Sequence, residues 1–458
     1  MKVEHSAQPG FNRRNFIGAS SVAAAYALLG GIELVPGQEP EKPADEKPAA
    51  PKVKCGVIGL GSWGRELVGT LQRVPQAELV AICDTYAAAL RRASRLAPGA
   101  TAIQNYRELL AAPELDAVLV ATPTHLHKEI VLAALEAGKH VYCEAPLAHT
   151  VEDAREIARA ARAAYKQIFQ AGLQYRSDNQ RLYVQRNIRS GELGSFVMVR
   201  AQWHKKQSWR AASPNPEREK ELNWRLDKAV SPGLVGEIGI HQLDQVCWFL
   251  NRLPLRVHGY GAIAAWADGR EVADTVQLVV EFPGQVRLLY DATLGSSFDA
   301  EQEVYFGTNA TVVMRGSRAW LFKEPDSPLA GWEVYAKKEL FVPSSETGIV
   351  IAADSSKQLL HVAPGQQPIT PEKTPLHQAL EAFVGNCAEF RAEVQDFTEA
   401  YGQTDRATFE QHMAANFKAR PAAGYREGFI ATLIALKANE AVVTGQPVEL
   451  RPEWFELG

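Results

Sequence analysis

This chain of 458 residues contains little cysteine and has no excess of positively charged residues. The five cysteines are odd in number and scattered through apolar runs, which argues against a disulfide framework or a CxxC metal knuckle; we expect small buried hydrophobic residues. Lysine and arginine number 49 against 53 acidic residues, a formal net charge of -4, which argues against a mainly electrostatic binder of nucleic acid. No uncharged apolar run reaches the roughly 20 residues of a membrane span, so no stable membrane anchor is expected.

The first 52 residues differ in composition from the rest. Arg13 and Arg14 precede an uncharged, alanine-rich stretch over residues 18–31. This pattern resembles a twin-arginine export signal, predicted over 1–37, and the prolines and alternating charges of 38–52 predict an extended linker. The resemblance implies a periplasmic or extracellular protein that meets the twin-arginine export machinery. A disordered tail that happens to contain two arginines is the alternative.

From Val53 onwards, apolar runs of strand length alternate with segments of helical periodicity. This alternation predicts βαβ units and an α/β domain with a doubly wound parallel sheet over 53–174. After about Tyr175, strand-like runs follow one another with short turns, which predicts a second α/β domain over 175–458 with an open, mostly antiparallel sheet. Three helices are expected in this second part, over residues 238 to 249, 376 to 400 and 424 to 444.

A glycine-rich turn follows the first predicted strand and precedes a helix. Residues 59–64 read GLGSWG, which matches GxGxxG in the place that dinucleotide binding requires. Gly59 permits the tight turn, Gly61 lets the backbone approach a pyrophosphate at the helix N-terminus, and Gly64 lets helix and strand pack closely. The residues of this turn predicted to bind the cofactor are Gly59, Gly61, Ser62, Trp63 and Gly64.

An acidic residue stands 20 positions beyond this turn, at the end of the second predicted strand. The carboxylate of Asp84 can accept hydrogen bonds from both ribose hydroxyls and repels a 2'-phosphate, which favours NAD over NADP. Arg91 and Arg92 weaken that preference slightly. A structural role in a strand-end turn is the alternative for Asp84.

Several further motifs recur in a fixed order, namely GLGSWG, DAVLVATPTHLH, ALEAGKHVYCEAP, GLQYR and VGEIGIHQLD. Together they resemble the Gfo/Idh/MocA oxidoreductases over most of residues 53 to about 270. The resemblance implies a Rossmann domain that binds NAD, a C-terminal domain whose open sheet often mediates homo-oligomerisation, and chemistry on a sugar or cyclitol hydroxyl. It also suggests the remaining cofactor-site residues, Thr122, Pro123, His127, Glu144 and Pro146. A helix-entry turn explains the first two equally well, and His127 could instead pack or cap at a helix start.

One position departs from the family pattern. Family dehydrogenases usually have Glu-Lys-Pro and use the lysine to hydrogen-bond the reacting oxygen, whereas this chain has alanine between Glu144 and Pro146. The methyl group of Ala145 can neither transfer a proton nor hydrogen-bond. Lys205 or Lys206 could replace the missing lysine, and the sequence leaves this open.

The motif VGEIGIHQLD supplies the candidate catalytic residues. A neutral imidazole can take a hydroxyl proton while a hydride leaves the same carbon, so His241 is the proposed general base. On a helix, Glu237 and Asp244 share a face with this histidine, and either carboxylate could orient the ring and stabilise its cation. A core histidine satisfied by a neighbouring acid is the alternative.

Four residues are candidates for contact with a substrate, with simple packing as the alternative for each. Tyr175 and Arg176 end the segment that crosses into the second domain, and Trp224 and Arg225 offer a stacking surface and a donor suited to a carbohydrate. No metal is assigned, because His125 and His127 lack a third ligand at a suggestive spacing.

Three functions therefore compete. The first is an NAD-dependent oxidoreductase acting on a sugar, a cyclitol or a derivative. The second is a redox-neutral, NAD-dependent glycoside hydrolase, which the absence of the lysine favours because that branch of the superfamily looks similar in this respect. The third is a non-catalytic sugar or nucleotide sensor, against which His241, Glu237 and Asp244 argue.

Overall fold

The computed structural model describes residues 52–316, 318–329, 331–334, 336, 338–340, 347–351, 373–402 and 405–458. The chain divides into two units, Met1–Ala50 and Pro51–Gly458. The predicted signal peptide (1–37) and the predicted linker (38–52), apart from Lys52, lie outside the described residues, and both stay predictions.

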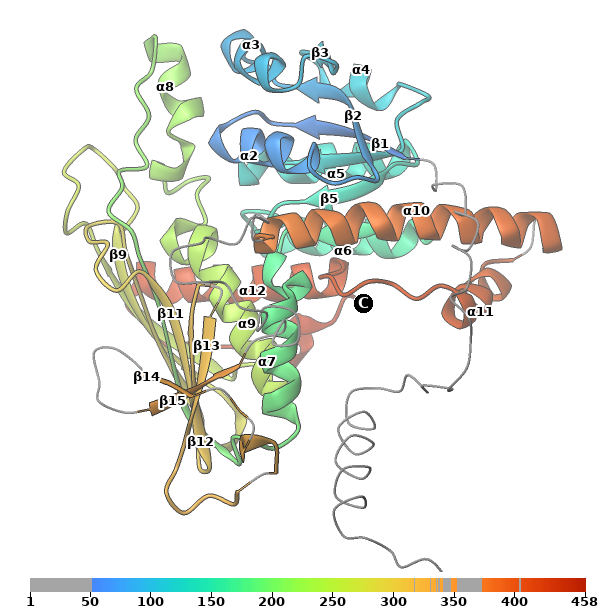
Figure 1. The fold of residues 1–458 in the computed structure, drawn as a ribbon. Helices are drawn as coiled ribbons and strands as arrows, with labels where there is room; N and C mark the ends of the chain where they lie inside the picture. The colour runs from blue at the N-terminus through green and yellow to red at the C-terminus, as the bar shows by residue number, and fades with distance from the viewer. Residues whose placement is uncertain are drawn as a thin grey trace, which may run out of the picture. The chain divides into compact units, whose positions relative to one another are not determined.

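The first part of the second unit is built on a six-stranded parallel sheet in the order β3-β2-β1-β4-β5-β6 (Figure 1). The chain starts at β1, moves outward to β3 and returns to β4, so the strand order reverses between β1 and β4. A crevice for a ligand forms at the carboxyl ends of the strands at such a switch point. The strands are β1 (Val53–Ile58), β2 (Ala77–Cys83), β3 (Thr101–Ile103), β4 (Ala117–Val120), β5 (His140–Cys143) and β6 (Phe169–Ala171).

Helices cover both faces of this sheet, which is why β4 and β5 are buried along their whole length. Five of them lie between the strands: α2 (Ser62–Leu71), α3 (Ala87–Leu96), α4 (Tyr106–Leu110), α5 (His127–Glu136) and α6 (Val151–Ala163). A sixth, α10 (Pro375–Tyr401), returns from far along the chain and buries Leu380 and Phe383 in the same core as Cys55 of β1. The predicted domain boundary at 174/175 stays a prediction. One helix that covers the parallel sheet, α10, comes from the part of the chain after that boundary.

The second sheet has ten strands in the order β14-β15-β13-β12-β11-β7-β10-β9-β8-β16. All neighbouring pairs are antiparallel except β7 and β10, which run parallel. The strands are β7 (Phe196–His204), β8 (Arg256–Ala262), β9 (Thr275–Glu281), β10 (Arg287–Thr293), β11 (Glu301–Gly307), β12 (Ala310–Arg315), β13 (Arg318–Lys323), β14 (Lys338–Leu340), β15 (Thr347–Ile351) and β16 (Val448–Glu449).

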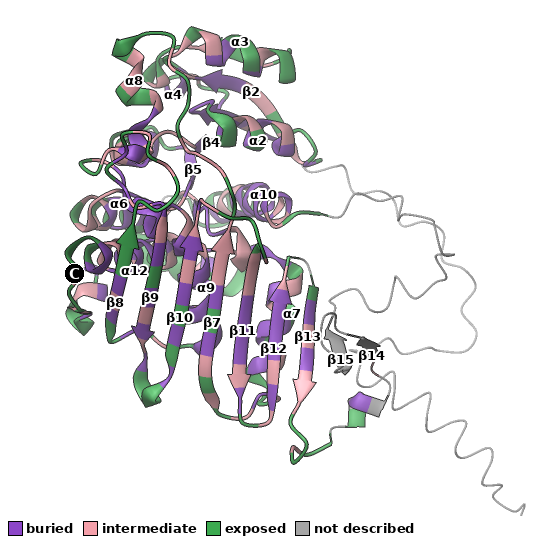
Figure 2. Cartoon of the chain, turned by 90° about the vertical axis from the view of Figure 1, so that its left-hand side faces the viewer, coloured by how far each residue is buried: buried purple, intermediate pink, exposed green. Residues whose placement is uncertain are grey.

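Helices cover one face of the second sheet, and the other face is open (Figure 2). The covering helices are α7 (Asn179–Arg189), α9 (Ile240–Leu250) and α12 (Tyr425–Thr444). Alternate residues of β10 show the asymmetry, because Leu288 and Tyr290 are buried under the helices while Leu289 is exposed on the open face. The remaining helices are α8 (Pro216–Leu222), α11 (Arg406–Asn416) and short helical turns at Thr124–Leu126, Gln174–Ser177, Trp224–Leu226, Pro283–Gln285, Gly331–Val334 and Pro452–Phe455.

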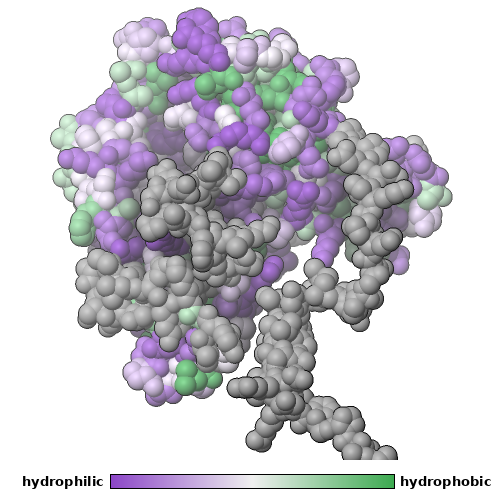
Figure 3. Space-filling model, viewed as in Figure 1, coloured by the Kyte–Doolittle hydropathy of each residue, from purple (hydrophilic) through white to green (hydrophobic). Residues whose placement is uncertain are grey.

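The predicted fold class is confirmed: an α/β chain with a doubly wound parallel sheet followed by a mostly antiparallel one. The helix expected over 238–249 is α9, preceded by a π-helical turn at Val235–Gly239. All five cysteines are buried and unpaired, as expected. Within the described residues no helix is long and apolar enough to span a membrane. Polar and apolar side chains are interspersed over the visible part of the surface in Figure 3.

Candidate cofactor and active site

The glycine-rich turn lies between β1 and α2, at the switch point of the parallel sheet. Gly59 has a φ of +92°, and a Cβ there would lie 2.6 Å from the backbone of Ala121; a Cβ on Gly64 would lie 1.8 Å from the carbonyl oxygen of Gly59. Packing within the protein therefore requires both glycines. A Cβ on Gly61 would meet no heavy atom within 4 Å, and no side chain caps α2. Open space before uncapped helical N–H groups fits the pyrophosphate of a dinucleotide.

Asp84 closes this turn from the end of β2. Its Oδ2 accepts a hydrogen bond from the Leu60 amide at 2.8 Å, and its Oδ1 accepts one from the Tyr86 amide at 2.7 Å. The carboxylate thus has the structural role that was the alternative reading. Each oxygen can accept more than one hydrogen bond, and Asp84 is only half-buried, so the ribose role stays a prediction that this geometry permits.

His127 joins the loops that follow β4 and β5. Its Nε2 lies 3.0 Å from the carbonyl oxygen of Thr122, and its Nδ1 lies 3.0 Å from that of Pro146. Burial lowers the pKa of this histidine to about 4. Because both nitrogens face backbone carbonyls, His127 positions the loops and does not offer a free nitrogen to a cofactor. A place for His127 beside the cofactor stays a prediction, and the sequence could not show its two carbonyl contacts because they come from separate loops.

Several polar atoms near these loops are buried and lack a hydrogen-bond partner among the described residues. They include Oγ1 of Thr122, after β4, and Oε1 of Glu144, after β5. Burial raises the pKa of Glu144 to about 7. Unsatisfied buried polar groups are uncommon, and a bound ligand is one way to satisfy them. Together with the open space at Gly61, they fit a cofactor that lies across the carboxyl ends of β1, β4 and β5.

Glu237 connects the second domain to the Rossmann loop. Its Oε1 accepts a hydrogen bond from Oγ1 of Thr124 at 2.8 Å, and its Oε2 accepts one from Nε of Arg225 at 2.8 Å. Thr124 follows Thr122 and Pro123 after β4, and Glu237 lies in the π-helical turn before α9. This buried carboxylate therefore fixes the turn that leads into α9, the helix that carries His241, against the loop that follows β4.

Asp244 is also held by an arginine. Arg176 donates to its two oxygens at 2.9 and 2.8 Å, which is a bidentate ion pair, and Asp244 is buried. The pair fastens the helical turn Gln174–Ser177 to α9. The guanidinium of Arg176 is thereby occupied in a structural contact.

The ring of His241 is not bonded to either carboxylate. Its Nδ1 is buried and has no hydrogen-bond partner among the described residues. The expectation that Glu237 or Asp244 orients the ring directly is therefore corrected, because arginines hold both acids. Burial lowers the pKa of His241 to about 4, with a smaller contribution from the charge of Arg181. The imidazole is neutral at pH 7 and has an unoccupied proton acceptor.

Tyr175 is the neighbour of this imidazole. The two rings meet edge to face with centroids 5.9 Å apart, and the tyrosine hydroxyl donates to Oε1 of Glu301. The guanidinium carbon of Arg181 lies 3.6 Å from the centre of the Tyr175 ring. Arg181 and Glu301 were missed in the sequence, because neither lies in a recognised motif and β11 approaches α7 only in the folded chain.

Of the other two candidate substrate residues, Trp224 is buried and Arg225 is partly exposed. Trp224 is 6% exposed, with Arg225 over its ring at 4.3 Å and His125 at its edge, 5.8 Å between ring centroids. It offers no free face for stacking a sugar, and Arg225 is paired with Glu237. His125 and His149 lie with their ring centroids 6.1 Å apart, each with a buried, unpartnered Nδ1.

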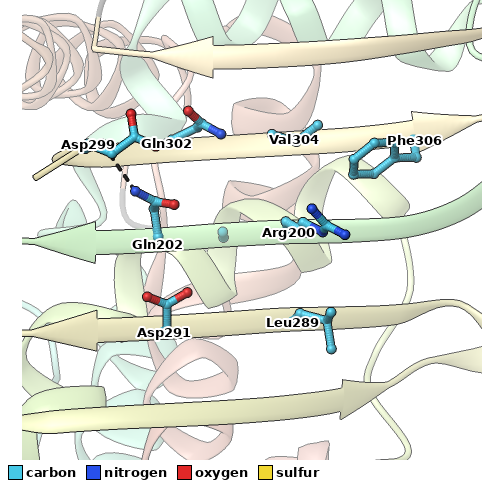
Figure 4. Close-up of a pocket in the computed structure, with 9 residues that line it drawn as sticks. Arg200, Gln202, Leu289, Asp291, Asp299, Gln302, Val304 and Phe306 are labelled. Atoms are coloured by element: carbon cyan, nitrogen blue, oxygen red, sulfur yellow. Dashed lines mark hydrogen bonds between the residues drawn. The ribbon is translucent and has the colours of Figure 1, made fainter.

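Among the described residues, no group of three or more His, Cys, Asp or Glu side chains could hold a metal ion. A hollow of about 420 Å³ lies on the open face of the second sheet, on the side away from α9 and its His241 (Figure 4). It is lined by Arg200, Ala201, Gln202, Leu289, Asp291, Asp299, Gln302, Val304 and Phe306.

Two family models match the chain. The model described as oxidoreductase family, NAD-binding Rossmann fold (GFO_IDH_MocA) matches residues 53–172, and the model described as GFO/IDH/MocA C-terminal domain matches residues 182–313. Together the two matches cover more than half of the chain. The first identifies the parallel sheet as an NAD-binding Rossmann domain, in agreement with the predicted cofactor.

Curated relatives match less than half of the chain. The inositol 2-dehydrogenase/D-chiro-inositol 3-dehydrogenase of Shouchella clausii is 34% identical over 201 residues, which cover 43% of this chain and 53% of that protein. The inositol 2-dehydrogenase of Klebsiella pneumoniae subsp. pneumoniae is 34% identical over 202 residues, which cover 43% of this chain and 55% of that protein. The chain spans about half the length of the curated relatives it matches.

Solved structures share the fold more widely. An oxidoreductase domain protein from Kribbella flavida has a TM-score of 0.66 and 21% identity, covering 88% of this chain and 100% of that one. A levoglucosan dehydrogenase in complex with NADH and levoglucosan has a TM-score of 0.61 and 18% identity, covering 87% of this chain and 99% of that one. At these identities the likeness establishes the fold.

Proposed function

Because this chain belongs to the Gfo/Idh/MocA family of oxidoreductases, we propose that it is an NAD-dependent oxidoreductase acting on a hydroxyl group of a sugar, a cyclitol or a derivative. Relatives named as inositol and levoglucosan dehydrogenases support this substrate class. The residues that would hold the cofactor are those of the Gly59–Gly64 turn with Asp84, Thr122 and Glu144.

When bound, NAD supplies an electrophilic nicotinamide ring that accepts a hydride from the substrate carbon. The protein must also remove the proton from the hydroxyl oxygen on that carbon, so that the alcohol becomes a carbonyl. His241 would take this proton, because its ring is neutral at pH 7 and its Nδ1 is not engaged by any described residue.

The surroundings of His241 disfavour a stable imidazolium, so the ring would hold the substrate proton only transiently. Burial and the charge of Arg181 both disfavour the imidazolium form, and no carboxylate bonds to the ring to stabilise it. The cation would therefore be short-lived and would release its proton to water in each cycle. Tyr175 would position the ring through its edge-to-face contact.

The observation that carries the proposal is the placement of an unengaged, neutral histidine four residues beyond Glu237, whose carboxylate bonds directly to the Rossmann loop at Thr124. The test compares His241→Asn with the wild type for NAD binding by calorimetry and for turnover by NADH absorbance. We expect NAD affinity within about twofold and turnover reduced by about 10²-fold or more, as for loss of a general base. Undiminished turnover would refute the assignment.

Ala145 supports a second candidate, redox-neutral glycoside cleavage. In that reaction, transient oxidation of a sugar hydroxyl acidifies the neighbouring C–H bond and permits elimination, and the hydride is later returned. The methyl group of Ala145 offers no donor to the reacting oxygen. Cleavage of aryl glycosides with bound NAD and without net NADH would favour this reaction, whereas stoichiometric NADH formation from a free sugar or cyclitol would favour the dehydrogenase.

Homo-oligomerisation through the open face of the second sheet is part of the proposal. This face exposes Tyr260 and Leu289 by 60% and 42%, and Leu289 also lines the hollow of Figure 4. Clustered apolar side chains on an open sheet support association with a second copy. Export of the folded protein by the twin-arginine route, with a periplasmic or extracellular location, rests on the sequence pattern at Arg13 and Arg14.

A further inference from the structure

Helix α8 stands apart from the domain to which it belongs. Its seven residues, Pro216–Leu222, include no buried side chain. The helix is specified locally, because Asn215 caps it by accepting a hydrogen bond from the Arg218 amide at 3.0 Å and proline occupies its first turn. Helices of this length are normally held by packing of an apolar face, which α8 lacks. Figure 1 shows α8 beside the carboxyl ends of β1 and β2.

Polar contacts fasten the base of the segment that carries α8. The Ala211 amide donates to Oδ1 of Asn223 at 2.7 Å, and Nδ2 of Asn223 donates back to the Ala211 carbonyl at 3.0 Å. Arg210 pairs with Glu219 of α8 and lies 3.8 Å from Asp268. These contacts close the segment into a loop of defined shape, so that α8 projects as a unit rather than as a free chain.

The tip of this loop contacts the Rossmann domain at one aromatic ring. The guanidinium carbon of Arg218 lies 4.3 Å from the centre of the Tyr86 ring, and Nε of Arg218 is buried without a hydrogen-bond partner. Tyr86 is tied to the predicted ribose ligand, because its amide donates to Oδ1 of Asp84. In a Rossmann domain the adenosine lies beyond this acidic residue. The contact therefore lies at the adenosine end of the nucleotide site.

We propose that the segment 211–223 is a strap across the adenosine end of the NAD site, and that opening of the Arg218–Tyr86 contact limits the release of NAD. The inference rests on NAD binding by the Rossmann domain and adds how the cofactor is retained. The second domain then meets the nucleotide site at two places, through Glu237 and Thr124 on one side and through Arg218 and Tyr86 on the other. A dinucleotide lying between them cannot leave while both are closed.

The strength of the Arg218–Tyr86 contact determines how much its loss should change the rate of NAD release. A partly desolvated cation–π contact accounts for roughly a three- to thirtyfold change in an equilibrium constant. Burial of Nε of Arg218 strengthens the contact, whereas the ion pair of Nη1 with Glu221 at 2.5 Å weakens it. We therefore expect a change in the equilibrium constant near the middle of this range. Loss of the contact should therefore accelerate NAD release by about tenfold.

The experiment measures the rate of NAD release from the full chain by stopped-flow displacement with excess NADH, followed by nucleotide fluorescence. The variants are Arg218→Ala, Tyr86→Ala and the two combined. Lys220→Ala is the matched control, because it removes one positive charge from an exposed position of the same helix. Circular dichroism of each variant without nucleotide verifies that the chain is folded.

The proposal predicts release about tenfold faster in each single variant, a double variant no faster than the faster single one, and a control within twofold of the wild type. The affinity for ADP-ribose should fall in Arg218→Ala, and that for nicotinamide mononucleotide should not, because only the former has an adenosine. Unchanged release rates with normal NAD binding, or equal acceleration in Lys220→Ala, would overturn the strap alone. A wild-type chain that binds no nucleotide would overturn the proposed function as well.

Discussion

The hydrogen bond from Thr124 to Glu237 offers a sharp test, because it links the Rossmann loop directly to the turn that precedes α9 and its His241. Thr124→Val replaces the hydroxyl with a methyl group of similar size. The change removes a 2.8 Å donor from a buried carboxylate while the packing volume is retained.

The expected cost follows from the charge of the acceptor. A hydrogen bond to a charged group contributes about 2 kcal/mol net, and Oε1 of Glu237 loses its donor in the variant. With an unfolding entropy of roughly 2 cal/mol/K per residue, this loss lowers the melting temperature of a chain of this size by about 2 °C. Because the turn also positions His241, turnover should fall by roughly tenfold.

Thr122→Val is a matched control two residues away. The hydroxyl of Thr122 is buried without a hydrogen-bond partner, so its removal should leave the melting temperature without nucleotide unchanged or slightly higher. If that hydroxyl bonds the cofactor, NAD affinity falls by up to about tenfold in this variant. Differential scanning calorimetry without NAD and titration calorimetry with NAD measure the two effects separately. Equal melting temperatures for Thr124→Val and the wild type would refute the structural reasoning.

Three further predictions concern other parts of the structure. Asp84→Asn should raise the affinity for NADP relative to NAD by about tenfold, since it removes a negative charge near the 2' position of the ribose. Titration with both nucleotides measures the ratio of the two affinities, and an unchanged ratio would exclude the ribose role of Asp84. Burial lowers the pKa of His140 to about 4 from 6.5, so between these pH values the unfolded chain binds a proton that the folded chain does not, and the free energy of unfolding decreases as the pH falls. Urea titrations at pH 7 and pH 4 should show that His140→Asn abolishes about 3 kcal/mol of this decrease. An equal decrease in the variant and the wild type would contradict this prediction. Leu289→Arg should dissociate a homo-oligomer in light scattering after gel filtration, and an unchanged mass would remove this face as the interface.

Local sequence patterns predicted the fold well, because their causes are local. The parallel sheet follows from alternating strand and helix periodicity, and the turn at Gly59 follows from a backbone conformation and a close approach that glycine alone permits. The helix α10 illustrates the limit. The apolar periodicity of its sequence predicted the helix and its approximate bounds. Its packing against β1 could not be predicted in this way, because the two elements are more than 300 residues apart in the chain.

The candidate site was predicted as a set of residues rather than as a set of contacts. Glu237, His241 and Asp244 share a helical face in the sequence, which suggested that the acids orient the histidine. In the structure Arg225 and Arg176 pair with the two acids instead. Helical spacing gives proximity along one element, whereas partners from other elements decide which hydrogen bonds form. Arg181 escaped prediction for the same reason.

The most direct test of the account is to purify the full chain, identify any released nucleotide by mass spectrometry after denaturation, and follow NADH absorbance with free sugars and cyclitols as substrates. The account predicts bound or bindable NAD and stoichiometric NADH formation that His241→Asn abolishes, with NAD affinity retained. Normal turnover in His241→Asn, or a wild-type protein with no affinity for nucleotide, would contradict it.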